Sequence, residues 1–359
     1  IRGLAQAREH LIQLPIMRRI LFIFIALLGL LTACVSTLTP ARPRPTDTPT
    51  LTVGSQTRPT DGGLETPSGS AARPQPTDTP APTVGSQTRP TDTPAPTAPL
   101  PTPTATPRPA FDPAAWKTQP VIPALSARMR AVYAAGQALG NNLRAFSKVG
   151  DCETVTDWFL DPFDRDARYY DLGPYTALKP AIEHFAGSFK RVSIASKRGF
   201  TAASALSPLW ADPEVCKAGE TPLACEFRVH RPSFVFIMLG TNDANTRATF
   251  EANLRKVIEA SLAQGVVPIL ATKADNIEGD ESLNITIARA AYDYEVPLWN
   301  FWLAAQPLPG HGLQFDGVHL THDKNNFGDP EAMLSAWPVR NLTALQTLDA
   351  VWRGAAGDK

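Results

Sequence analysis

The segment Phe146-Ser147-Lys148-Val149-Gly150-Asp151-Cys152 places a nucleophilic side chain just after a short predicted strand. We expect the strand over Phe146–Val149, with its end at Gly150. Phe234–Leu239 is a continuous apolar run of the kind that forms buried strands, and Gly240 ends it in the same way. Each of these two strands is therefore followed by a glycine and then by polar side chains.

Helices and strands are predicted to alternate through the folded part of the chain. Helices are expected over Ala124–Asn142, Thr246–Gln264 and Leu283–Tyr294, and further strands over Val266–Ala271 and Val296–Phe301. In the first helix, the positions expected to face inward are Met129, Val132, Tyr133 and Leu139. In the second, they are Phe250, Leu254, Val257, Ile258 and Leu262. This alternation predicts an α/β fold, in which a central parallel sheet carries helices on both faces.

Two further tracts carry side chains suited to acyl chemistry. Gly240-Thr241-Asn242-Asp243 offers a neutral amide donor for a developing oxyanion. In Asp316-Gly317-Val318-His319, the three-residue spacing allows a carboxylate to orient an imidazole within one turn. Taken alone, the first tract is more often a turn with a helix cap, and the second more often a structural histidine. Ligands of parallel sheets bind beyond the carboxyl ends of the strands, where both Cys152 and Asn242 are expected.

Together, and in this order, these tracts resemble the SGNH/GDSL hydrolase family of esterases, lipases and carbohydrate deacetylases over residues 146–321. The resemblance implies a three-layer, flavodoxin-like fold. It implies Cys152 as nucleophile where the family has serine, His319 as general base and Asp316 as its orienter. The oxyanion hole would consist of the N–H groups of Cys152 and Gly199 and the side-chain amide of Asn242. Gly199 is assigned from a single glycine.

The four cysteines leave three interpretations of Cys152. Cys216 and Cys225 lie close in sequence in a chain with an export signal, so a disulfide is the expected pairing. Cys152 is then a free thiol, either as a working nucleophile or as a relic in an inactive or binding-only descendant. In the third interpretation, Cys152 pairs with Cys216 or Cys225 and catalysis is blocked.

The N-terminal region (residues 1–33) is predicted to be a signal peptide, with the natural start at Met17. Arg18 and Arg19 precede the apolar run Ile20–Leu31, which at 12 residues is short for a membrane span. The following Leu31-Thr32-Ala33-Cys34 resembles a bacterial lipobox. The resemblance implies cleavage before Cys34, lipidation of its sulfur and display at the outer face of the membrane. A plain transmembrane anchor is the alternative.

Residues 34–110 are expected to form a disordered tether, and residues 111–359 the folded domain. Of the 35 prolines, 17 lie between Ala41 and Ala110, a stretch without Phe, Trp or Tyr. The unit Ala41–Asp61 recurs almost unchanged as Ala72–Asp92. Such a composition cannot bury enough apolar surface to offset the entropy lost on folding.

The sequence therefore predicts an exported lipoprotein that hydrolyses an ester or acetyl group on an extracellular glycan or small ester. A weak or inactive glycan-binding module and a structural surface spacer are the alternatives. No cofactor or metal is expected, because no His/Cys/Asp cluster has ligand spacing. With 34 basic and 34 acidic side chains, the composition indicates no nucleic-acid partner. The oligomeric state is not predicted.

Overall fold

A computed structural model describes residues 109–357 of the chain. The predicted signal peptide, Cys34 and nearly all of the predicted tether lie outside the described residues. Within the described part, no helix is both long and apolar enough to cross a bilayer.

The central sheet has four parallel strands in the order β1-β3-β4-β5. Their bounds are Asn142–Gly150 for β1, Pro232–Met238 for β3, Val267–Ala271 for β4 and Leu298–Trp299 for β5. All residues of β3 and β4 are buried, as expected for central strands covered on both faces. The predicted parallel sheet is therefore confirmed.

A short segment extends this sheet beyond β1. Ser196 forms a parallel bridge with Gly150, and Lys197 N–H donates to the Gly150 carbonyl at 3.2 Å. The segment that follows β1 in sequence thus lies on the outer side of β1, while β3 lies on the inner side. This order is the flavodoxin-like order of doubly wound sheets, and it reverses direction between β1 and β3.

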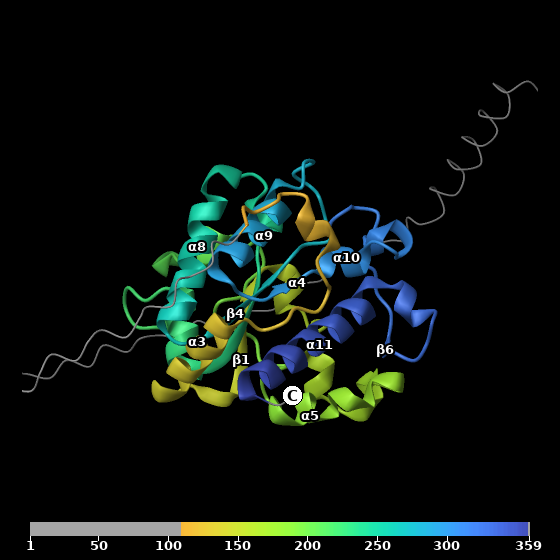
Figure 1. Ribbon diagram of the computed structural model, residues 1–359, viewed down its shortest axis with the longest axis horizontal. Helices are drawn as coiled ribbons and strands as arrows, with labels where there is room; N and C mark the ends of the chain where they lie inside the picture. The colour runs from red at the N-terminus through yellow and green to blue at the C-terminus, as the bar shows by residue number, and fades with distance from the viewer. Residues whose placement is uncertain (1–108, 358–359) are drawn as a thin grey trace, which may run out of the picture. The chain divides into compact units, whose positions relative to one another are not determined.

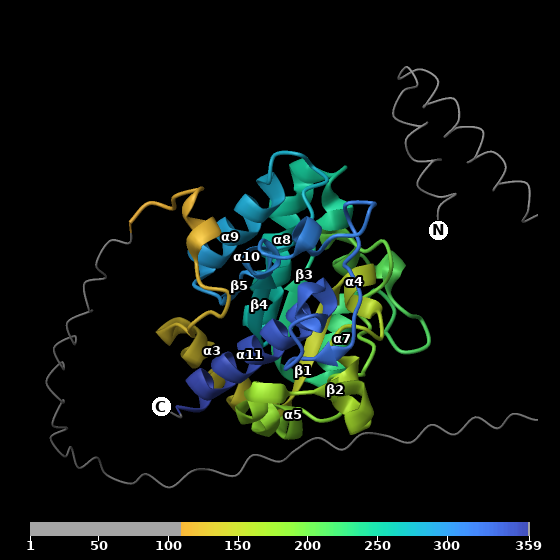
Figure 2. The same cartoon turned by 90° about the vertical axis from the view of Figure 1, so that its right-hand side faces the viewer.

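Helices cover the sheet in two layers, so the predicted three-layer α/β fold is confirmed (Figures 1 and 2). On one side, α11 (Ala336–Ala356) contacts α3 (Ala127–Ala138) and α5 (Lys179–His184). The helices on the other side are α6 (Ala202–Ala205), α7 (Pro222–His230), α8 (Arg247–Ala263) and α9 (Ser282–Tyr294). Among them, α8 contacts both α6 and α9.

Shorter elements connect these layers. The remaining helices and strands are α4 (Cys152–Val155), α10 (Phe301–Ala305), β2 (Tyr170–Asp171) and β6 (Asn325–Asn326). The 3-10 helices are η1 (Ala115–Thr118), η2 (Asp161–Asp164), η3 (Ala167–Tyr169), η4 (Gly173–Leu178), η5 (Pro208–Trp210), η6 (Thr241–Asp243), η7 (Pro309–Gly312) and η8 (Ala332–Leu334).

Two predicted elements are shorter than expected. The first helix begins after Ser126, whose hydroxyl accepts a hydrogen bond from Met129 N–H, and Leu139 at its end is 55% exposed. Leu139 was therefore wrongly assigned to the core, because the chain turns at Gly140 (φ 82°) into β1. The last predicted strand shrinks to Leu298–Trp299, since the Asn300 side chain caps α10.

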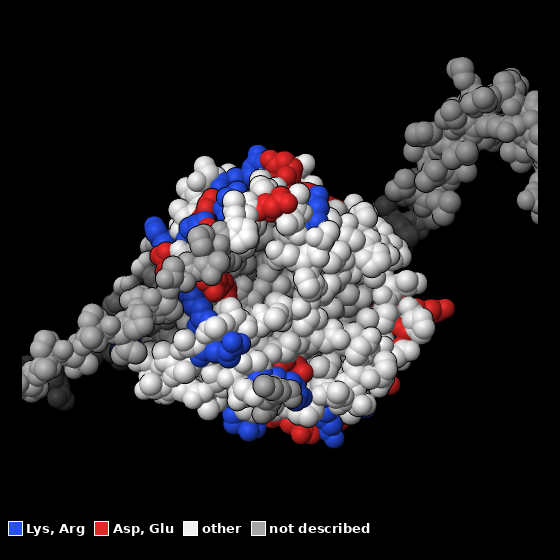
Figure 3. Space-filling view, in the orientation of Figure 1, with Lys and Arg blue, Asp and Glu red and all other residues white. Residues whose placement is uncertain are grey.

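Figure 3 shows one face of the molecule, on which acidic and basic side chains alternate around the rim and other residues form the centre. On this face no large field of one sign is present.

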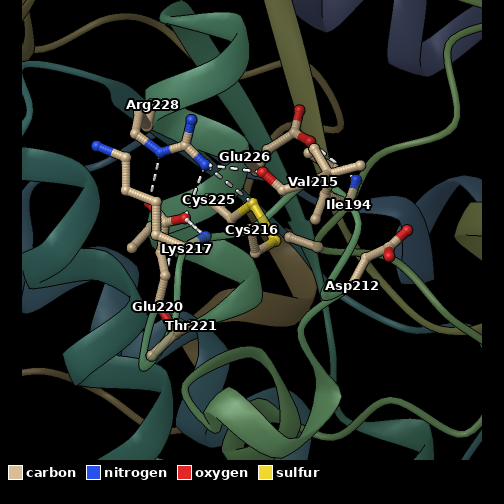
Figure 4. Close-up of a disulfide and its surroundings, with 12 residues drawn as sticks. Ile194, Asp212, Val215, Cys216, Lys217, Glu220, Thr221, Cys225, Glu226 and Arg228 are labelled. Carbon is tan, nitrogen blue, oxygen red and sulfur yellow. Dashed lines mark hydrogen bonds and ion pairs between the residues drawn. A yellow bond between two sulfur atoms is a disulfide. The ribbon is translucent and has the colours of Figure 1, made fainter. Parts of the chain in front are cut away.

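A disulfide joins Cys216 to Cys225 at the start of α7 (Figure 4). The next residue, Glu226, is fully buried and accepts hydrogen bonds from Arg191 Nη1 at 2.6 Å and from Ile194 N–H at 2.8 Å. Glu226 also accepts from the Ser147 hydroxyl on β1. The disulfide-bonded helix therefore holds the segment that leads to the loop carrying Gly199.

Candidate active site

The end of β1 places Cys152 at the carboxyl edge of the sheet. A side chain at Gly150 would meet the Met238 carbonyl of β3 and the Thr154 hydroxyl, so glycine is required there. Asp151 then caps α4, because its Oδ1 accepts from Glu153 N–H at 3.1 Å. Cys152 begins that short helix at the point where the strand order reverses.

Cys152, His319 and Asp316 form a connected series. His319 Nδ1 lies 2.7 Å from Asp316 Oδ2, and His319 Nε2 lies 4.0 Å from Cys152 Sγ. The other oxygen of Asp316 accepts from the backbone N–H groups of Val318 and His319, each at 3.0 Å. The fold thus brings the thiol, 167 residues away in sequence, to the ring nitrogen that the carboxylate leaves free.

Electrostatics in this series favour a basic imidazole. Hydrogen bonds from the His319 ring and from two backbone amides lower the pKa of Asp316 to about 2. The hydrogen bond to that carboxylate raises the pKa of His319 above its ordinary value. Asp316 remains ionised through the physiological range, and it fixes the imidazole in the tautomer with its proton on Nδ1.

The thiol of Cys152 is held in its protonated form. Burial raises its pKa to about 11, and the negative charges of Asp151 and Glu153 act in the same direction. This environment is the opposite of the electropositive one that produces a standing thiolate. A thiolate can therefore form only as His319 removes the proton while the sulfur attacks.

Asn242 lies beside the nucleophile. Its side-chain amide donates to Asp151 Oδ2 at 3.2 Å, and its second N–H has no acceptor among residues 109–357. Gly240, at φ 134°, provides the backbone turn from β3 into η6. Asn242 thus offers one free amide hydrogen close to Cys152, as an oxyanion donor requires.

Gly199 is exposed in the loop between Lys197 and Ala202 and makes no hydrogen bond to Cys152, Asn242 or His319. Its φ of 78° favours glycine, and its N–H has no acceptor in the described part of the chain. The loop is fixed at both ends, since Lys197 N–H donates to Gly150 and Ala202 N–H donates to Asp243. Its role as an oxyanion donor stays a prediction.

Two residues of the site were not identified from the sequence. Glu153 accepts a hydrogen bond from Leu320 N–H at 3.4 Å, and it therefore links the nucleophile's helix to the histidine loop. Arg340 of α11 donates to the other Glu153 oxygen at 3.3 Å. The available signal was the position of Arg340 among Trp337, Val339 and Leu342, since a buried arginine needs a partner.

A small cavity of about 40 Å³ lies behind the nucleophile, with Asp151, Glu153, Lys273, Asp275 and Arg340 among its lining residues. This volume holds one or two water molecules. Burial raises the pKa of Asp151 to about 6, against the lowering effect of Arg340. Arg340 Nε has no hydrogen-bond partner among the described residues, so the cavity offers it a place for water.

Among the described residues, Cys216, Glu220 and Cys225 lie close enough together to resemble a metal-ligand set (Figure 4). The two sulfurs are bonded to each other, and Glu220 instead accepts two hydrogen bonds from Arg228. Cys152 is a free thiol, so its pairing with either cysteine does not occur in this structure.

Comparisons with known proteins give only distant structural likenesses. No family model matches the chain, and no curated protein matches it. Similar solved structures include a catalytic mutant of the acetylxylan esterase Axe2 from Geobacillus stearothermophilus, with 14% identity, a TM-score of 0.39, and coverage of 58% of this chain and 95% of that one.

TesA has 20% identity and a TM-score of 0.36, and the match covers 57% of this chain and 97% of that one. A GDSL-like lipase from Bacteroides thetaiotaomicron has 15% identity and a TM-score of 0.34, with coverage of 62% and 98%. With TM-scores below 0.5, these likenesses decide neither the fold nor the chemistry, which rest on the strand order and the site geometry.

Proposed function

We propose that this protein hydrolyses ester or acetyl groups, with Cys152 as nucleophile, on an extracellular glycan or a small ester. The observation that supports the proposal is the series Cys152 Sγ, His319 and Asp316, with separations of 4.0 Å and 2.7 Å. A carboxylate-oriented imidazole facing a nucleophile at the carboxyl edge of a parallel sheet is suited to acyl transfer.

In the first half of the reaction, His319 Nε2 takes the proton of Cys152 as the sulfur bonds to the ester carbonyl carbon. The negative oxygen that results is stabilised by the Asn242 amide and by the N–H groups of Cys152 and Gly199. The carbon–oxygen bond to the alcohol then breaks, and the protonated His319 gives its proton to the departing alcohol. The product is a thioester on Cys152.

In the second half, His319 removes a proton from water as the water oxygen attacks the thioester carbonyl. The carbon–sulfur bond breaks, and the proton returns to sulfur, so that free thiol and carboxylic acid are formed. No step in this cycle requires a group other than the three side chains, the oxyanion donors and water.

The test is hydrolysis of p-nitrophenyl acetate by the purified chain and by Cys152→Ala and His319→Ala. We expect both variants to lose activity to the background rate. His311→Ala is the matched control, because this exposed histidine forms its hydrogen bond with the Gln306 carbonyl and none with a residue of the series. Equal rates for the wild type and both site variants would overturn the proposal.

A catalytically weak glycan-binding module is the second candidate. The raised pKa of Cys152 favours it, since a protonated thiol is a poor nucleophile. Wild-type protein that binds oligosaccharides but does not release nitrophenol above background would support this candidate over the hydrolase.

We also propose that the chain is exported and lipid-anchored through Cys34 at the outer face of the membrane. The lipobox-like tetrapeptide ending in Cys34 supports this, as does a disulfide between Cys216 and Cys225, because such bonds persist in oxidising compartments. Labelling with palmitate in a bacterial host should modify the wild type and not Cys34→Ala. Equal labelling of both would contradict the proposal.

A further inference from the structure

A pocket of about 490 Å³ lies on the surface of the described part of the chain. It lies between residues 157–171 and residues 324–326. Its volume is within the range of small-molecule sites. It contains none of Cys152, His319 and Asp316, so it is a separate space from the site described above.

The pocket has aromatic walls that face solvent. Trp158 and Tyr169 line it, with 40% and 48% of their surfaces exposed. The guanidinium of Arg165 lies 5.3 Å from the centre of the Tyr169 ring and holds that ring from one side. Exposed rings lining a pocket mark a binding surface rather than core packing.

The pocket also carries polar groups with hydrogen-bonding capacity to spare. The Lys324 ammonium and the Asn326 side-chain NH₂ have no partner among residues 109–357. On the other wall, Asp171 Oδ1 accepts from Gly173 N–H and Asp157 Oδ2 lies 3.7 Å from Arg165 Nη2, and each carboxylate keeps lone pairs for a further donor. Aromatic faces combined with free donors and with these acceptors match the two surfaces of a sugar ring, which are apolar C–H faces and a hydroxyl edge.

The walls are held in place by buried contacts. Asn341, fully buried on α11, donates to the Trp158 carbonyl at 2.7 Å and to Asn325 Oδ1 at 2.8 Å. It also accepts from Leu160 N–H at 2.8 Å. On the floor, β2 pairs with β6 through Tyr170 and Asn325. One side chain therefore fixes both walls, and the pocket is formed before any ligand arrives.

The pocket is connected to the candidate active site through both of its walls. Trp158 follows Cys152 by six residues, so their Cα atoms are at most about 22 Å apart. Its ring lies 4.5 Å from that of His322, three residues after His319. A sugar chain seated in the pocket can therefore extend to the thiol.

We propose that this pocket is a subsite for a polysaccharide of glucose-configured pyranose units that carries the ester cleaved at Cys152. Sugars of that configuration hold their hydroxyls equatorially, so that both ring faces are C–H surfaces suited to Trp158 and Tyr169. This inference rests on the proposed function for the location of the cleaved bond. The binding of the sugar chain itself does not depend on it.

The test compares two substrates and one ligand on the full chain. Partially O-acetylated cellohexaose and p-nitrophenyl acetate measure turnover, and unacetylated cellohexaose measures binding by calorimetry. We expect Trp158→Ala and Tyr169→Ala to lower kcat/KM for the hexasaccharide about tenfold each, and to leave p-nitrophenyl acetate within about twofold. Trp158→Phe should recover part of the loss, and Leu139→Ala, an exposed apolar position elsewhere, should change neither rate.

The outcomes test the sugar subsite independently of whether Cys152 hydrolyses an ester. Cellohexaose that binds the wild type but not Trp158→Ala supports the subsite even if nothing is hydrolysed, in which case only the proposed function fails. Wild type that cleaves p-nitrophenyl acetate but does not bind cellohexaose overturns the subsite alone. If Trp158→Ala lowered kcat/KM equally for both substrates, Trp158 would be a residue that supports the catalytic loops, and the subsite proposal would again be overturned.

Discussion

Arg340 and Glu153 form a buried ion pair beneath the nucleophile, with Arg340 Nη1 3.3 Å from Glu153 Oε2. The guanidinium lies against the rings of Phe159, Trp299, Phe301 and Trp337, at 4.7 to 5.9 Å from their centres. Glu153 reaches the histidine loop at Leu320 N–H. The pair therefore connects helix α11, the cysteine and the histidine through one carboxylate.

Replacing Glu153 should change the acidity of the thiol. Its negative charge helps to raise the pKa of Cys152, so Glu153→Gln should lower that pKa below about 11. The measurement is the rate of iodoacetamide alkylation against pH, with Cys152→Ala as the blank. An unchanged midpoint would show that Glu153 does not act on the thiol. Glu153→Ala, which also lacks an acceptor for Leu320 N–H, should reduce esterase activity more than Glu153→Gln.

Removal of the arginine should destabilise the fold. Arg340→Met leaves the Glu153 carboxylate partly buried without its cation, and breaking such a pair costs about 3–5 kcal/mol of unfolding free energy. Urea denaturation measures the loss. The double variant Arg340→Met/Glu153→Gln should recover part of it, because no unpaired charge remains. A double variant as unstable as the single one would assign the loss to packing against the four rings instead.

Serine in place of Cys152 is expected to keep esterase activity in this site. Because Asp151 and Glu153 oppose a standing thiolate, the thiol, like a hydroxyl, has to pass its proton to His319 as it attacks. We expect Cys152→Ser to hold kcat/KM for p-nitrophenyl acetate within about tenfold of the wild type, since the same base activates both nucleophiles. Activity as low as that of Cys152→Ala would contradict this expectation.

The pH profile should report His319. The imidazole acts as a base only when neutral, and its pKa is raised by Asp316, so activity should fall as the pH drops through a value above 6.5. Asp316→Asn removes the cause of the shift. The acid limb should then move to lower pH, while the plateau rate falls about a hundredfold or more because the ring loses its orientation. An acid limb at the same pH in both proteins would assign it to another group.

Much of this organisation follows from local sequence. The alternation of apolar runs predicted the α/β class, since β3 and β4 are buried on both faces and α8 and α9 are amphipathic. The pairing of Asp316 with His319 was also predictable, because three residues within one turn bring the two side chains together without help from the rest of the chain. Both predictions depend only on residues that are close together in the chain, through their spacing or their apolar periodicity.

Other features depend on contacts between distant segments. The 4.0 Å approach of Cys152 to His319 spans 167 residues, and it requires the strand order that places both loops at one sheet edge. The raised pKa of Cys152 comes mainly from burial. Asn341 fixes two pocket walls, one 16 and the other 183 residues away from it in sequence. The amino-acid order alone shows which chemical groups are present and which neighbours they meet within a turn. The desolvation and the charge around the sulfur follow from the folded arrangement, because both depend on which distant side chains exclude water from it.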